Sequence, residues 1–136
     1  MDIFILLIHF QEKQTILLVG GKDGESCDSL LMLEHNEQNW KQLSIKLPYS
    51  IYGHGAQFLN DNLYIFAGNS KCTHKLSKSL QWEKMADMNQ ECWAISNSNI
   101  ILNNQIWVCG GYNRIDSGLK SVEMYDPLTN KWKYMK

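Results

Sequence analysis

Several features that would identify a function directly are missing from this sequence of 136 residues. Its four cysteines show no C-x-x-C spacing, and their separations match no template for a zinc or haem site. No Asn-x-Ser/Thr acceptor for glycosylation is present, and nothing in the sequence predicts a disulfide framework. These absences favour a reducing, cytoplasmic setting.

A large net charge is also missing. The formal net charge is −1, which gives no electrostatic attraction to nucleic acid or to an anionic membrane. The apolar stretch of residues 3–8 is too short to span a bilayer as a helix. It follows Asp2 instead of a basic segment and no small-residue cleavage site follows it, so we interpret residues 4–10 as a strand. We expect neither nucleic acid nor a membrane as a partner.

Helical patterns and prolines are scarce as well. No run is long and periodic enough for a helix. Both prolines, Pro48 and Pro127, fall between expected strands, where a missing N–H costs no ladder bond. The apolar fraction of 44% and the charged fraction of 20% are ordinary for a globular protein. The sequence thus predicts one all-β region over residues 1–136.

A repeat runs through this region. Pairs of small residues close three apolar runs, and the second members of the pairs lie 47 and then 43 residues apart, a period typical of propeller folds. The continuous apolar character of the runs predicts strands covered on both faces. The pairs are Gly20-Gly21, Ala67-Gly68 and Gly110-Gly111, and the runs before them are residues 16–19, 63–66 and 106–109.

Tight turns precede two of the three runs. Asn60-Asp61 and Asn103-Asn104 are residue types that tolerate positive φ, so each predicts the tip of a β-hairpin. The first copy has residues 10–14 there, which predicts a turn two residues longer. The strands entering these turns are expected at 4–10, 55–59 and 96–102.

A tryptophan follows each glycine pair, and three residues after it comes Leu or Met. A tryptophan buries a large apolar area and its indole N–H needs a partner, so we expect it between adjacent repeats. Strands precede it at 30–33 and 121–125, whereas the second copy is irregular at 72–76. The residues of this W-x-x-[LM] pattern are Trp40 and Leu43, Trp82 and Met85, and Trp132 and Met135.

These residues resemble the kelch repeat family. The third copy has the whole pattern, from Gly110-Gly111 through Tyr125-Asp126 to Trp132, whereas the first has Leu33-Glu34 for Tyr-Asp and the second has no such pair. The resemblance implies that Asp126 accepts hydrogen bonds in a turn. It also implies a partial kelch-type β-propeller of three four-stranded antiparallel blades, at about 3–47, 54–88 and 94–136.

Three blades are too few to close a ring, since propellers have about 4 to 8. The chain is then part of a longer protein, or two copies complete a ring together, or it is a decayed fragment. An open stack exposes apolar sheet faces. We therefore expect the isolated chain to aggregate or to dimerise.

Catalytic and metal-binding patterns are not found. The four histidines do not have metal-ligand spacing, and there is no G-x-S-x-G motif or activated cysteine. His54 is interpreted as a turn residue. We expect no catalytic residue, no metal and no cofactor, and hence no enzyme. The alternative from a different class of function is a propeller enzyme that acts on a sugar, of the oxidase or epimerase type.

Loops offer the remaining functional residues. In a four-stranded meander, the turn after the second strand and the link to the next blade emerge on one face. Aromatic and Arg side chains there are typical of interaction hot spots, although the aromatic rings can instead fold onto blade edges. The expected segments are residues 22–28, 48–54, 69–73, 89–93 and 112–119, and the candidate binding residues are Tyr49, Tyr52, Trp93, Tyr112 and Arg114.

The kelch resemblance implies a protein or peptide ligand. Substrate recognition for a cullin-type ubiquitin ligase is the implied context, with actin or cytoskeleton binding as the alternative. Such adaptors often carry Arg at the start of a blade, but residues 50–52 and 90–92 contain none. A strongly acidic ligand is therefore not expected.

Overall fold

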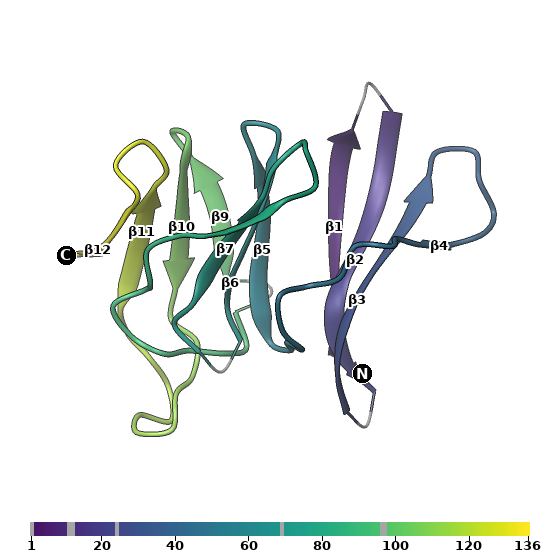
Figure 1. Cartoon of the computed structure of the whole chain (residues 1–136). Helices are drawn as coiled ribbons and strands as arrows, with labels where there is room; N and C mark the ends of the chain where they lie inside the picture. Colours follow the sequence, from purple (N-terminus) through teal and green to yellow (C-terminus); the bar gives the residue numbers. More distant parts are fainter. Residues whose placement is uncertain (1, 11–12, 24, 69, 96–97) are drawn as a thin grey trace. The chain divides into compact units, whose positions relative to one another are not determined.

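The computed structural model describes residues 2–10, 13–23, 25–68, 70–95 and 98–136. Every regular element within these ranges is a strand, and the strands form three four-stranded sheets in which chain neighbours pair antiparallel (Figure 1). The all-β architecture of three four-stranded antiparallel sheets is thereby confirmed. None of the described segments is a helix that could cross a membrane. The chain forms two compact units, Met1–Tyr52 and Gly53–Lys136, called unit 1 and unit 2.

Unit 1 holds the first sheet. The long β2 and β3 remain paired as far as Asp23 and Glu25, so the loop expected over residues 22–28 is wrong. Gly21, Lys22 and Asp23 continue the pairing with β3 beyond the irregularity at the glycine pair, so the residues that indicated a loop form a longer hairpin instead. The strands are β1 (Asp2–Phe10), β2 (Lys13–Asp23), β3 (Glu25–Glu34) and β4 (Lys41–Gln42).

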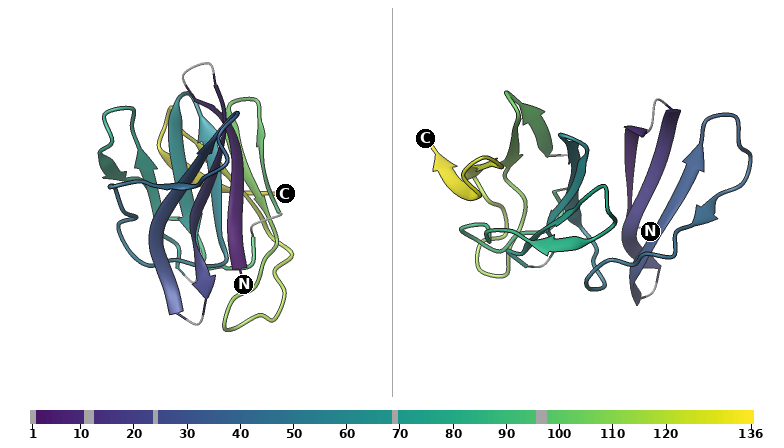
Figure 2. Two further views of the ribbon diagram at one scale, coloured as in Figure 1. Left: turned by 90° about the vertical axis from the view of Figure 1, so that its right-hand side faces the viewer. Right: turned by 45° about the horizontal axis from the view of Figure 1, so that its top comes forward.

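Unit 2 holds the other two sheets (Figure 2). The middle sheet contains β5 (His54–Leu59), β6 (Asn62–Ala67), β7 (Thr73–Leu76) and β8 (Trp82–Lys84). The third contains β9 (Asn99–Leu102), β10 (Gln105–Cys109), β11 (Val122–Asp126) and β12 (Lys131–Met135). The short β7 agrees with the irregular sequence of the second copy. Residues 96 and 97 of the expected strand 96–102 and residue 69 of the expected loop 69–73 lie outside the described residues.

The two predicted Asn-rich turns have the expected geometry. Asn60 and Asp61 have φ values of 50° and 61°, and Asn103 and Asn104 have values of 52° and 57°. Two consecutive residues with positive φ form the tight turn that suits the twist of a hairpin. In the first copy, Phe10 pairs with Lys13. The expected longer turn there is wrong, because only residues 11 and 12, which lie outside the described residues, separate the two.

The small-residue pairs allow the link between repeats to pass close to the sheet. All six residues have positive φ, including Ala67 at 64°. A Cβ atom on Gly111 would approach Cγ2 of Ile95 to 2.6 Å, and one on Gly20 would approach Cγ2 of Ile51 to 2.9 Å. A side chain at Gly20 or Gly111 would therefore meet both backbone strain and a clash.

The W-x-x-[LM] pattern is explained by strand pairing. The last residue of each motif pairs with the third strand of its own sheet. Leu43 donates its N–H to Leu30, Met85 donates to Thr73, both over 2.9 Å, and Met135 pairs with Val122. The recurring Leu or Met thus marks one structural position in each sheet.

The Tyr-Asp pair of the third copy organises the turn before Trp132. Asp126 accepts hydrogen bonds of 3.0 Å from the N–H of Leu128 and from the hydroxyl of Thr129, as the resemblance implied. The Tyr125 hydroxyl donates to Oδ1 of Asn130 over 2.9 Å. The same Oδ1 accepts the N–H of Ala86, so the turn is also tied to the link that follows β8.

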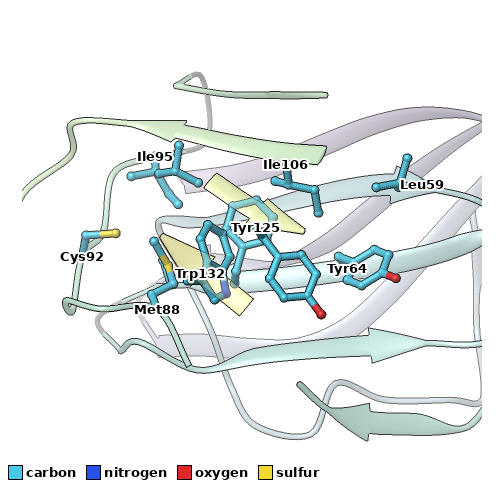
Figure 3. Packing of buried hydrophobic residues seen from close by; sticks show 11 residues of the cluster. Leu59, Tyr64, Met88, Cys92, Ile95, Ile106, Tyr125 and Trp132 are labelled. Carbon is cyan, nitrogen blue, oxygen red and sulfur yellow. The ribbon is translucent and has the colours of Figure 1, made fainter. Parts of the chain in front are cut away.

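The core of unit 2 lies between its two sheets. The rings of Tyr125 and Trp132 lie 5.2 Å apart, and Trp132 lies 5.7 Å from Phe66 of β6. Trp132 is therefore buried between successive sheets, as expected. Trp82 is half-buried, and the expectation is wrong for Trp40, which precedes the two-residue β4 and is 43% exposed. The cluster is completed by Leu59, Tyr64, Ala67, Met88, Cys92, Ile95, Ile106 and Val108 (Figure 3).

Candidate binding surface

Three loop segments of unit 2 meet at one end of its strands. We call this end, formed by residues 68, 70–72, 85–95 and 110–121, the loop end. Ser70 and Cys92 form an isolated antiparallel bridge. Trp93 and Tyr112 exchange two backbone hydrogen bonds of 3.0 and 3.1 Å. The expectation that turns and inter-sheet links emerge together is confirmed for this unit.

Three of the five predicted binding residues come together here. Trp93 is half-buried, whereas Tyr112 is 52% exposed. The guanidinium of Arg114 lies 3.9 Å from the carboxylate of Glu91, and the two side chains are 74% and 42% exposed. Such an exposed ion pair stabilises little. Arg114 is thus positioned at the surface and remains accessible to a ligand.

The tip of the loop after β10 carries a residue that sequence reasoning missed. Ile115 is 91% exposed. Oδ1 of Asn113 accepts the N–H groups of Ile115 and Asp116 over 2.9 and 2.6 Å, so the backbone under this side chain is fixed. The loop extends beyond the strand ends in Figures 1 and 2. An Asn two positions before an apolar residue in a loop was the available signal.

Tyr49 and Tyr52, the other two predicted residues, belong to unit 1. Both are half-buried, and Nζ of Lys22 lies 4.9 Å above the Tyr52 ring in a cation–π contact. The segment that holds them is attached to β3, since Leu47 and Ile51 donate to carbonyls of Asp28 and Cys27. Tyr52 is thus engaged within its own unit.

Polar contacts behind the loop end hold the link after β8. The buried Glu123 carboxylate accepts from the backbone N–H and the side-chain amide of Asn89 over 2.9 and 2.8 Å. The amide of Gln90 donates to the hydroxyl of Ser121. Burial, together with the charges of Glu123 and Glu91, raises the pKa of the Cys92 thiol to about 12. Cys92 therefore stays protonated at neutral pH and does not serve as a thiolate nucleophile.

Both histidines of unit 2 lie in strands, His54 in β5 and His74 in β7. His54 is 1% exposed at the first position of β5, so its interpretation as a turn residue is wrong. Burial, and secondarily the charge of Lys84, lowers the pKa of His74, which favours its neutral form. Within the described ranges, no three His, Cys, Asp or Glu side chains are grouped as a metal site requires.

Three successive four-stranded antiparallel meanders, each with a pair of small residues near the end of its second strand, define a β-propeller repeat protein. The sequence profile of the Kelch motif matches residues 98–136, which cover the third sheet. Curated relatives named kelch-like proteins match 86 to 90% of the chain. Residues 98–136 thus carry a Kelch motif, and the chain is similar to kelch repeat proteins.

Two relatives and one solved structure show the extent of this similarity. Spermatocyte protein spe-26 of Caenorhabditis elegans is 30% identical over 88% of this chain and 23% of its own length. Kelch-like protein 40 of Mus musculus is 33% identical over 86% of this chain and 20% of its own length. The structure of YjhT superposes with a TM-score of 0.71 at 18% identity, over 90% of this chain and 42% of that one. The chain thus spans 20 to 23% of the length of these two relatives.

Proposed function

We propose that this chain is a non-enzymatic interaction module that binds a protein or peptide through the loop end of unit 2. The observation that carries the proposal is the fixed presentation of Tyr112, Arg114 and Ile115. Exposed Tyr and Arg side chains are typical of binding hot spots, and the exposed Ile115 adds apolar area next to Arg114 in the loop. Two backbone hydrogen bonds with Trp93 hold Tyr112 in place.

The charges at the loop end indicate what kind of segment binds there. Lys71, Arg114 and Lys120 are interspersed with Glu91 and Asp116, so neither sign dominates. Recognition then rests on shape and on contacts with Tyr112 and Ile115, and charge sets the register. We propose an apolar-polar peptide segment as the ligand, and not a strongly acidic one.

For the cellular context, we propose substrate recognition for a cullin-type ubiquitin ligase, on the basis of the kelch resemblance. Cytoskeletal binding is the alternative within the same class of function. A cytoplasmic location is part of this proposal. It is supported by the four cysteines, which are all free thiols.

A peptide-display selection against the purified chain tests the proposal. Enriched peptides are synthesised, and their affinities are measured for the unmodified chain and for Ile115→Asp and Arg114→Ala. Leu80→Asp is the matched control, because Leu80 is also exposed but lies in the turn at the opposite ends of the strands. We expect at least a ten-fold loss for the loop variants and no loss for the control. Failure to enrich any peptide, or equal affinity in all variants, would refute the proposal.

A further inference from the structure

The contact between the two sheets of unit 2 shows which side chains each sheet contributes when two sheets pack face to face. The third sheet contributes Ile106, Tyr125 and Trp132, which are paired side by side across three strands. The middle sheet receives them with Tyr64 and Phe66, whose rings lie 5.8 Å from Tyr125 and 5.7 Å from Trp132 respectively. One face thus supplies an indole ring, and the other supplies the aromatic side chains that pack against this face.

The first sheet carries a second copy of the indole-supplying face. Ile16 lies four residues before Gly20, as Ile106 lies four before Gly110, and it pairs with Leu33 as Ile106 pairs with Tyr125. Trp40 therefore stands at the place of Trp132. The side chains of this face are only half-buried or exposed, whereas the alternate residues Thr15, Leu17, Val19 and Leu30 are at most 5% exposed.

The third sheet carries a second copy of the receiving face, on the side away from its core. Burial alternates along β10, so the expectation that this strand is covered on both faces is wrong. Leu102 and Trp107 stand where the middle sheet has Leu59 and Tyr64. Ile100 and Leu102 are 60% and 52% exposed, and Cys109 is exposed beside them. The β9 side of this outer face is therefore apolar and open.

We propose that these two faces dock head to tail between two copies of this chain, with Trp40 of one copy seated on the outer face of the third sheet of the other. The chain itself supplies both halves of the contact, which repeats the one within unit 2. An open apolar face of this kind marks an interaction surface. In this proposal each copy uses both faces with the same partner, so the association ends at a dimer. The six four-stranded sheets of two copies are a number within the range of closed propellers.

One position distinguishes this contact from the internal one. In the middle sheet, Thr73 accepts the indole N–H of Trp132 and pairs with Phe66, the residue before Ala67-Gly68. In the third sheet, Val122 pairs with Cys109, the residue before Gly110-Gly111. Val122 therefore occupies the position that corresponds to Thr73. Val122 offers no hydroxyl to Trp40. The intermolecular contact is therefore weaker than the one within unit 2.

Sedimentation velocity of the full 136-residue chain tests the proposal across a dilution series. We expect a dimer for the unmodified chain and monomers for Trp40→Ala and for Ile100→Glu. Because the two variants are damaged on opposite faces, an equimolar mixture is expected to form a 1:1 dimer. Val122→Thr is expected to tighten the dimer about five-fold, which corresponds to one added hydrogen bond.

Leu128→Glu, in the exposed turn before β12, is the control and is expected to remain dimeric. Circular dichroism checks that each variant keeps its sheets. A monomeric unmodified chain, a mixture that stays monomeric, or dimerisation that survives Trp40→Ala would each overturn the proposal. None of these results bears on peptide binding at the loop end, so the two proposals fail separately.

Discussion

The indole N–H of Trp132 donates a hydrogen bond of 3.0 Å to the hydroxyl of Thr73, and both residues are buried. This bond joins the last strand of the third sheet to the third strand of the middle sheet. The one polar atom of the indole ring thus has a hydrogen-bond partner inside an apolar cluster.

Replacing Thr73 by Val keeps the shape of the side chain but removes the acceptor. The buried indole N–H then has no partner, and we expect unit 2 to lose about 1 to 3 kcal/mol in the free energy of unfolding. Urea denaturation followed by tryptophan fluorescence measures this loss. Thr73→Ser retains a hydroxyl and is expected to lose less; an equal loss in both variants would show that the hydrogen bond is not the cause.

Trp132→Ala removes the ring itself from between the sheets. We expect a loss of about 3 to 5 kcal/mol, as for other large-to-small substitutions in a core. Leu128→Ala, at a position that is 93% exposed, serves as the control. A loss below about 1 kcal/mol for Trp132→Ala would contradict burial between sheets.

Gly111→Ala tests the close passage of the link against the glycine pair. The residue has a φ of 102°, and its new Cβ would meet the side chain of Ile95 at 2.6 Å and the carbonyl of Trp93 at 3.0 Å. We expect a loss above about 2 kcal/mol, because strain and clash add. Gly118→Ala is the matched control, since nothing lies within 4 Å of its Cβ position. Equal stabilities of the two variants, measured by thermal unfolding, would exclude this explanation.

Alkaline pH is expected to destabilise unit 2 through Cys92. The thiol has a pKa of about 12 in the folded chain, against about 8.5 when unfolded. The stability it contributes is complete below the unfolded pKa and is lost as pH rises, because the unfolded chain releases the proton first. The slope for this group is about 1.4 kcal/mol per pH unit. Burial also raises the pKa of Tyr125 and Tyr64, which adds loss of the same sign at higher pH.

Urea denaturation between pH 7 and pH 10, compared with Cys92→Ala, isolates the contribution of the thiol. The variant is expected to have a shallower decline above pH 8.5. Identical declines in both proteins would contradict the proposed role of Cys92.

Local features of the fold were predictable because they follow from local rules. Asn60 and Asn103 favour positive φ, and paired small residues permit a left-handed turn, whatever lies around them. What was missed depends on distant contacts. The same W-x-x-[LM] motif gives a buried Trp132 and an exposed Trp40, because burial is set by the sheet that does or does not cover the motif.

The candidate surface was predictable only in part for the same reason. Tyr112 and Arg114 were found from residue type and loop position. Ile115 was not, because whether an aliphatic side chain in a loop is covered depends on the surrounding segments, and the structure leaves it 91% exposed. The tie between Asn130 and Ala86 joins segments 44 residues apart and has no local signature.

The clamp made by Asn113 has a consequence for how recognition changes over evolution. Its side chain, and not those of the residues at the tip, determines the course of the backbone there. Substitutions of Arg114 and Ile115 therefore do not require a new loop conformation. The entropic cost of ordering this loop is incurred during folding and not during ligand binding. New ligand preferences are then reachable by single substitutions on an unchanged support.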